Sequence, residues 1–193
     1  MESVTQRGVF DTAQVANNEN NRFTKECIYE ALWELIKHQD YNTITITQIA
    51  NKAGVSRNAI YRNFESKDDI IRKRLLECYH SFTRIINHLQ QGVSREEYVT
   101  IVCEYLCRQR EISEPLVKAN LTEFLLESFA YIKGTYNTDT ETEYYENYRI
   151  GGAIFVYLTW ISKGCQETPK QLADIVNHIC SSPAVIPDLK NIE

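Results

Sequence analysis

The run from Thr45 to Phe64 constrains the fold most, because it carries two helix-start signals separated by a short glycine turn. At the first signal, Thr45 is followed three residues later by Gln48, which makes a capping-box pair. Ile44 and Ile49 occupy the two positions of a hydrophobic staple around the same start. The two devices agree and predict a helix that opens at Thr45.

The second signal follows Gly54, a residue that takes the left-handed backbone conformation at a helix end with little steric cost. Ser56 then supplies an oxygen for the free amides of a second helix, and Val55 and Ile60 repeat the staple spacing. This layout is typical of a helix-turn-helix. Five apolar side chains are expected to face inward and hold the two helices together: Ile49, Ala50, Val55, Ile60 and Phe64.

The polar side chains of the second helix would remain exposed. In the major groove of DNA, Arg pairs with guanine and Asn with adenine, whereas Ser, Tyr and Lys more often hold phosphates. The pattern therefore predicts a DNA-binding surface. Two alternatives are an ordinary helical hairpin and, for Thr43–Ile46, a very short strand with alternating side chains. The exposed set is Arg57, Asn58, Tyr61, Arg62 and Asn63.

These motifs resemble those of the TetR family of transcriptional repressors. The shared pattern is a Thr-capped helix, Ile-Ala-x-x-Ala-Gly-Val-Ser, x-x-x-Ile-Tyr-x-x-Phe and a following Ser-Lys, in detail over residues 23–75 and as a helix layout beyond. Asn58 and Asn63 depart from it, since the family often has a small residue and His there. The resemblance implies phosphate contacts from Thr45, Ser56, Tyr61 and Lys67, and base or backbone contacts from Arg57, Asn58 and Arg62.

Length and composition bound the fold class. A chain of 193 residues with 43% apolar residues can bury a core as one domain or two small ones. It has only seven Gly and four Pro, and no strand-rich block follows Ile46. We expect an all-α protein in which an N-terminal three-helix helix-turn-helix domain joins a C-terminal helical domain for ligand binding and dimerisation.

Charge is divided unevenly along the chain, whose net charge is -5. Residues 22–91 carry eleven Lys and Arg against eight Asp and Glu, whereas residues 92–193 carry nine against fifteen. The basic share thus coincides with the helix-turn-helix, as a nucleic-acid contact at one end of the protein would require.

Four segments are expected. Residues 1–21 are polar and Asn-rich and are predicted to form a mobile arm. Residues 22–67 form the DNA-binding domain, whose first helix starts at Phe23, residues 68–182 form the regulatory and dimerisation domain, and residues 183–193 form a tail. Further helices are predicted from Ser66 to about Leu89, from Ser94, from near Ser113 with a break near Asn120, from Tyr144 to Lys163, and after the capping Thr168.

Dimerisation is suggested by the segment Ile150–Ile161, which is apolar on nearly every side but too short to span a bilayer. One neighbouring helix would not cover it, so two helices from a second copy would complete a four-helix bundle. The alternative is that both helices fill the core of a monomer. The predicted interface consists of Gly151, Ile154, Tyr157, Leu158, Ile161, Leu172, Ile175, Val176 and Ile179.

A ligand pocket is implied by the resemblance, which does not identify the small-molecule inducer. Aromatic side chains in the C-terminal half could line it, since Tyr combines apolar surface with a polar tip. The candidates are Tyr98, Tyr105, Phe124, Tyr148 and Phe155.

Six Cys without a CxxC pair, and no apolar signal segment, predict reduced thiols in the cytoplasm. Cys103 and Cys107 share a helix face, which leaves a redox or metal sensor open as an alternative trigger. A helical enzyme is a third hypothesis, but HExxH, glycine-rich phosphate loops and Glu-x-x-His pairs are missing. We therefore expect a ligand-responsive repressor that binds an inverted-repeat operator as a homodimer, with no enzymatic activity, cofactor or bound metal and no membrane contact.

Overall fold

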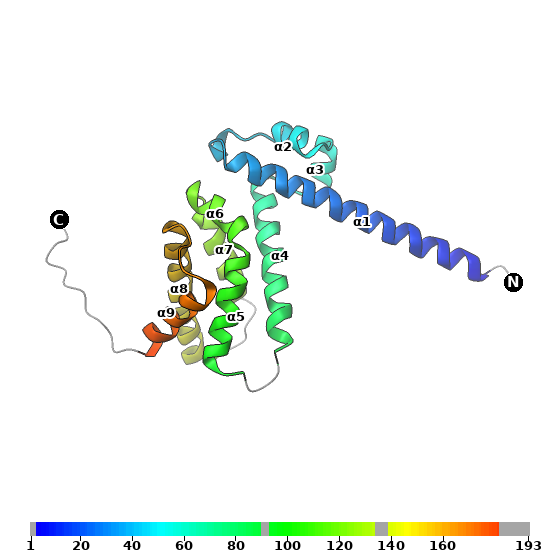
Figure 1. Cartoon of the computed structure of the whole chain (residues 1–193). Helices are drawn as coiled ribbons and strands as arrows, with labels where there is room; N and C mark the ends of the chain where they lie inside the picture. The colour runs from blue at the N-terminus through cyan, green and yellow to red at the C-terminus, as the bar shows by residue number, and fades with distance from the viewer. Residues whose placement is uncertain (1–2, 90–92, 134–138, 182–193) are drawn as a thin grey trace. The chain divides into compact units, whose positions relative to one another are not determined.

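The computed structural model describes residues 3–89, 93–133 and 139–181, and within them every regular element is helical. The predicted all-α fold is confirmed. None of these helices is both long and apolar enough to cross a membrane. In chain order the elements are α1 (Ser3–Ile36), the 3-10 turn η1 (Tyr41–Thr43), α2 (Ile46–Ala53), α3 (Arg57–Asn63), α4 (Lys67–Asn87), α5 (Arg95–Arg108), α6 (Arg110–Lys118), α7 (Thr122–Lys133), α8 (Thr140–Ser162) and α9 (Pro169–Ser181) (Figure 1).

The chain divides into two compact units. The first comprises Met1–Thr83 and Ile112–Tyr136, and the second Arg84–Glu111 and Asn137–Glu193. Unit 1 therefore contains α1 to α3, most of α4 and α6, and α7. Side chains explain why α6 and α7 cluster with the helix-turn-helix: the Trp33 indole N–H donates to the carbonyl of Ile112 at 2.8 Å, and Arg72 pairs with Glu127 at 2.8 Å.

The local helix signals behave as predicted. Gln48 N–H donates to the hydroxyl of Thr45 at 3.2 Å, and the backbone N–H of Thr45 donates to Oε1 of Gln48 at 2.8 Å, which completes the capping box. Gly54 ends α2 in the left-handed conformation with φ +67°. The strand alternative for Thr43–Ile46 is wrong, because Thr43 ends η1, Ile46 begins α2, and the two extended residues between them are caps rather than part of a strand.

The first helix begins at Ser3, well before its predicted start at Phe23. No proline interrupts residues 3–22, and a helix nucleated by the packed residues further on propagates at little cost. Apolar periodicity begins only near Phe23, which explains why the sequence predicts that the helix starts there. The mobility expected of residues 1–21 stays a prediction.

The core of the helix-turn-helix forms where α2 and α3 lie against the C-terminal half of α1 (Figure 1). Phe64 is 2% exposed and meets the ring of Tyr29 edge-on, with ring centroids 5.5 Å apart. Ile28 and Leu32 of α1 are fully buried. Of the five side chains predicted to face inward, Ile49, Ala50, Ile60 and Phe64 are buried and Val55 is half-buried.

Two short helices of unit 1 differ in detail from their prediction. α6 begins at Arg110, earlier than the expected start near Ser113, so Pro115 lies in its second turn rather than its first. The predicted break near Asn120 is confirmed, since Asn120 adopts φ 57° and Leu121 N–H donates back to the carbonyl of Leu116 at 2.8 Å. α7 then starts at Thr122.

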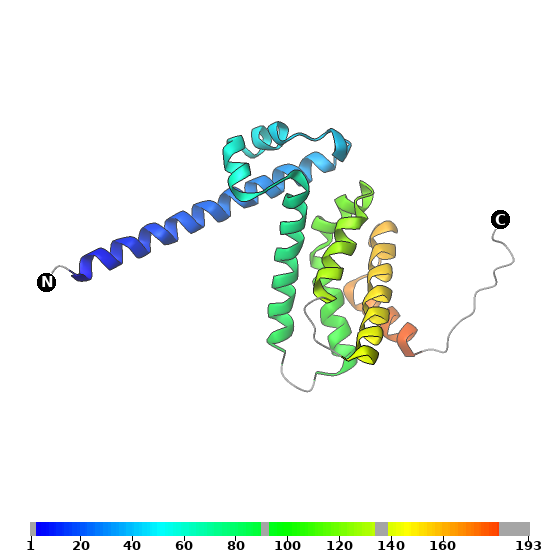
Figure 2. The ribbon, with the colours of Figure 1, turned by 180° about the vertical axis from the view of Figure 1, so that it is seen from behind.

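Unit 2 is built from α5, α8 and α9, which are neighbours in both views (Figures 1 and 2). α5 packs against α9, and the Tyr157 hydroxyl of α8 donates to the carbonyl of Leu106 on α5 at 3.2 Å. The capping boxes predicted at Ser94 and Thr168 are both present.

Four members of the predicted dimer interface are buried within their own chain, because α5 packs against α9 and also contacts α8. Packing inside one chain, the alternative to the dimer, accounts for the burial of these four, while the dimer itself stays a prediction. The side chains concerned are Ile154, Tyr157, Ile161 and Leu172.

Candidate nucleic-acid interface

The exposed face of α3 is polar. Ala59 and Ile60 are buried on the inner side of this helix, with 8% and 0% exposure. Tyr61 is 58% exposed although it is a large aromatic residue, so the core does not require it. The side chains that α3 presents to solvent are Arg57, Asn58, Tyr61 and Arg62, as the sequence predicts.

The two capping residues differ in what they offer to a phosphate. The hydroxyl oxygen of Ser56 accepts the Ala59 N–H at 3.1 Å, a contact that leaves the hydroxyl hydrogen of Ser56 for an external acceptor. The hydroxyl of Thr45 instead donates to Oε1 of Gln48 at 2.9 Å. A phosphate contact from Thr45 therefore requires this hydrogen bond to be exchanged, whereas one from Ser56 does not.

Asn63 lies at the end of α3 and is half-buried. Its side-chain amide donates to the carbonyl of Ala59 at 2.9 Å, so the side chain folds back along its own helix. The DNA contact predicted for Asn63 competes with this bond.

Lys67 opens α4 and is held inside unit 1. Its ammonium donates to the carbonyls of Tyr41 at 2.5 Å and Ile44 at 3.0 Å, and lies 4.0 Å from the Tyr41 ring centroid. Burial lowers the pKa of Lys67, while Asp68 and Asp40 act in the opposite direction. The ammonium has three donors and these carbonyls use two, so the predicted phosphate contact relies on the third.

The other basic residues near the start of α4 also bind within the protein. Arg72 pairs with Glu127, Lys73 with Asp69 at 2.8 Å, and Arg74 with Glu26 at 3.1 Å. Part of the positive charge of residues 22–91 is therefore already paired with carboxylates of the protein. The cations exposed on α2 and α3 are Lys52, Arg57 and Arg62.

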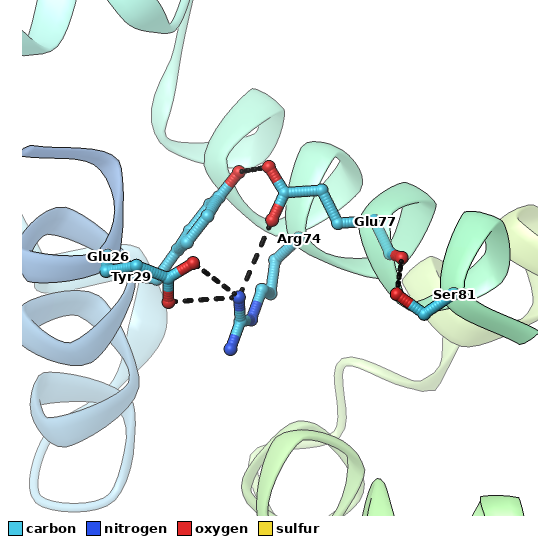
Figure 3. A network of polar contacts seen from close by, with 5 residues as sticks. All are labelled: Glu26, Tyr29, Arg74, Glu77 and Ser81. Atoms are coloured by element: carbon cyan, nitrogen blue, oxygen red, sulfur yellow. Dashed lines mark hydrogen bonds and ion pairs between the residues drawn. The ribbon is translucent and has the colours of Figure 1, made fainter. Parts of the chain in front are cut away.

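Arg74 belongs to a network that joins α1 to α4 (Figure 3). Its guanidinium lies between the carboxylates of Glu26 and Glu77 and 5.0 Å from the Tyr29 ring centroid. The hydroxyl of Tyr29 donates to Glu77 at 2.9 Å, and the hydroxyl of Ser81 donates to the backbone carbonyl of Glu77 at 2.9 Å. Burial, the negative charge of Glu77 and the hydrogen bond from Tyr29 to Glu77 together raise the pKa of Tyr29. The network couples α4 to the helix that supports α2 and α3.

The sequence pattern did not single out Lys52 or the internal partners of the α4 cations. Lys52 lies outside the second helix, on which the DNA-binding pattern rests, although its position in the last turn of α2 places it beside the glycine turn. The i, i+4 spacing of Asp69 and Lys73 is a readable signal for an ion pair. Nothing in the local sequence indicates that Lys67 would reach carbonyls more than twenty residues earlier.

The aromatic residues predicted to line a ligand pocket fall in different places. Phe124 belongs to unit 1 and is buried. Its ring centroid lies 6.2 Å from that of Tyr41 and 5.1 Å from Cζ of Arg72. Tyr105 is buried on α5 and Tyr98 is half-buried there, whereas Tyr148 and Phe155 of α8 are 82% and 68% exposed. The pocket stays a prediction.

The cysteine pair of α5 lacks the environment of a reactive thiol. Burial raises the pKa of Cys103 to about 11, and burial also raises the pKa of Cys107. Thiolate is the reactive form of cysteine, and burial disfavours it at both positions. Across the part of the chain that the structure describes, no three His, Cys, Asp or Glu side chains gather to hold a metal ion.

A glycine turn joins the two short helices α2 and α3, and α3 presents a polar face to solvent. This arrangement defines a helix-turn-helix DNA-binding protein. The family model described as "Bacterial regulatory proteins, tetR family" matches residues 28–73. The model described as "Transcriptional regulator C-terminal region" matches residues 99–182. Together they span most of the chain, which belongs to the TetR family of DNA-binding transcriptional regulators.

Solved structures share this fold, although no curated protein matches the sequence. The fatty acid degradation regulator FadR from Bacillus halodurans is 20% identical with a TM-score of 0.52, over 80% of this chain and 93% of that one. A Clostridium perfringens protein described as a fatty acid metabolism regulator is 19% identical with a TM-score of 0.54, over 83% and 100%. The dihydroxyacetone kinase operon activator DhaS is 15% identical with a TM-score of 0.51, over 81% and 92%.

Proposed function

We propose that this protein is a ligand-responsive repressor that binds an inverted-repeat operator as a homodimer. The observation that carries the proposal is the outward polar face of α3, where four hydrogen-bonding side chains lie opposite buried Ala59 and Ile60. We assign base contacts to Arg57 and Asn58, base or backbone contacts to Arg62, and phosphate contacts to Ser56 and Tyr61. Lys52 is added to the phosphate contacts because it is exposed beside the turn.

Dimerisation is supported by the apolar side chains that α8 and α9 leave exposed. Phe155 is 68% exposed on α8, and Ile175 and Ile179 are 43% and 56% exposed on α9. Gly152 of α8 is also exposed, with no atom within 4 Å of the place a Cβ would take, so a second backbone can approach. We therefore shift the proposed interface from the buried face of α8 toward Phe155, and keep Ile175 and Ile179 in it.

A homodimer fits the symmetry of DNA sites. Two recognition helices that enter successive major grooves must lie about 34–36 Å apart, and a two-fold protein matches an inverted repeat. A ligand that favours a different separation lowers operator affinity through its differential binding to the two states. We propose that α4 transmits this change, because the network around Arg74 ties it to α1.

The same proposal has no enzymatic step. Both matching family models describe regulators, and burial disfavours the thiolate forms of Cys103 and Cys107 that the redox alternative needs. We place the protein in the cytoplasm, where the DNA lies and where cysteine thiols stay reduced.

Selection of bound fragments from random duplex DNA tests the proposal, with binding then measured by gel shift over a range of salt concentrations. An inverted repeat should emerge. Arg57→Ala should relax the preference at one position in each half-site, by about 1–3 kcal/mol. Arg108→Ala, which removes an exposed arginine of α5, is the matched control and should leave the preference unchanged. An Arg57→Ala variant with unaltered preference would show that Arg57 does not read a base.

A further inference from the structure

The last backbone carbonyl of α3, the proposed recognition helix, accepts a hydrogen bond from a lysine of α4. Nζ of Lys73 lies 2.9 Å from the backbone carbonyl oxygen of Asn63 and 2.8 Å from Oδ2 of Asp69. The same carboxylate oxygen accepts the backbone N–H of Glu65 at 2.8 Å. Lys73 and Asp69 therefore join the end of α3, the turn that follows it and the beginning of α4 in one set of contacts.

Packing reinforces these polar contacts. The ammonium of Lys73 lies 5.5 Å from the ring centroid of Phe64, which follows α3 directly and is anchored against Tyr29 of α1. Burial would raise the pKa of Asp69, but hydrogen bonds from Lys73 and from the Glu65 amide bring that pKa below its ordinary value. The carboxylate therefore stays charged at neutral pH and keeps hold of both partners.

A helix as short as α3 depends on such contacts. It spans seven residues, and isolated helices of that length are unstable in water. Ser56 satisfies an amide at its first turn, while Lys73 places a positive charge at its C-terminal carbonyls, where the helix dipole favours a cation. The orientation of Arg57, Asn58 and Tyr61 toward DNA follows from how both ends are held.

We propose that Lys73, together with Asp69, positions the recognition helix and so sets operator affinity and sequence preference without contacting DNA. The inference rests on the proposed function, because it concerns DNA binding by α3. A lysine this close to a DNA-binding helix would otherwise be assigned to a phosphate. The two roles differ in salt dependence, since only a phosphate contact releases a counterion from DNA.

The test uses the full chain and the duplex that the wild-type protein selects from random DNA. Lys73→Met should weaken binding to this duplex about tenfold, as expected for loss of a hydrogen bond from a charged group. It should affect random duplex less and leave the slope of log Kd against log salt unchanged. Lys73→Arg keeps the charge and the donors and should restore most of the affinity. Lys118→Met, which removes an exposed lysine of α6, controls for the lost charge.

Hydrogen exchange of the Glu65 amide is the second readout. Without DNA, it should be faster in Lys73→Met and in Asp69→Asn than in the wild type. A salt slope smaller by about 0.9 would show a phosphate contact and overturn the proposal, as would unchanged affinity. If Lys73→Met does not fold, Asp69→Asn carries the same binding measurements. Failure of the wild type to select any duplex contradicts the proposed function instead.

Discussion

Basic residues of the helix-turn-helix differ in their partners, and this divides their roles. Arg57 and Arg62 are exposed on α3, whereas Lys67 donates to two backbone carbonyls and Arg74 lies between two carboxylates. A cation held by acceptors within unit 1 must give up those bonds before it binds a phosphate. Removing Arg62 should therefore affect DNA binding alone, whereas removing Arg74 should affect stability as well.

Ionisation of Tyr29 is expected to lower the free energy of unfolding at alkaline pH. Burial and its bond to Glu77 raise the pKa of this hydroxyl above the ordinary 10.0, so its stabilising contribution is present below pH 10 and is lost as the pH rises through the folded-state value. In urea unfolding, Tyr29→Phe should lower the free energy of unfolding by about 1 kcal/mol at pH 8 and should flatten its decline above pH 10. Tyr148→Phe alters a hydroxyl on an 82% exposed residue and should change neither quantity.

Helices α2 and α3 are individually too short to be stable, so their ends are stabilised by caps. Thr45 and Ser56 cap the two starts through side-chain oxygens. Gly54 closes α2, where its amide bonds to the carbonyls of Ala50 and Asn51. The angle between α2 and α3 therefore depends on one residue with a left-handed backbone.

Gly54→Ala tests that dependence. The site has room for a Cβ, with no atom within 4 Å, so the penalty comes from the backbone conformation at φ +67°. We expect the free energy of unfolding to fall by about 1 kcal/mol, measured by urea denaturation. Gly54→Asn should lose less, because Asn tolerates this conformation. Equal losses in the two variants would point to the side chain rather than the backbone as the cause.

At the scale of the whole molecule, α8 has two faces with different roles. Tyr157 and Ile161 are 2% exposed and belong to the core of unit 2, while Phe155 on the same helix is 68% exposed. Exposure of Tyr144, Tyr145 and Phe155 leaves an apolar face of the kind that marks a protein interface.

The double variant Phe155→Glu with Ile179→Glu should turn the proposed homodimer into a monomer in sedimentation at micromolar concentration. Both side chains are exposed, so folding should be preserved, while two charges placed in the interface oppose association. Binding to a full inverted repeat should weaken more than binding to a half-site, because the two helix-turn-helix domains are no longer linked in one dimer. Gln166→Glu adds a charge at an exposed residue and is the control. A double variant that still sediments as a dimer would place the interface elsewhere.

Features that depend on residues close together in the sequence were readable from it. The caps at Thr45, Ser56, Ser94 and Thr168 each involve an atom three residues away, and all four lie where the pattern predicts. The outward side chains of α3 follow from the helical period in the same way. These features account for the all-α fold and for most of the candidate site.

What the pattern could not supply depends on contacts between distant segments. Lys67 bonds to carbonyls 26 and 23 residues earlier, and Tyr157 bonds to a carbonyl 51 residues earlier. No local spacing encodes such partners, so the sequence predicts neither the internal bonds of Lys67 nor the hydrogen bond of Tyr157 within its own chain. Whether a cation is available to DNA, and which face of an apolar helix is covered, is decided only when separate helices pack together and compete for the same side chains.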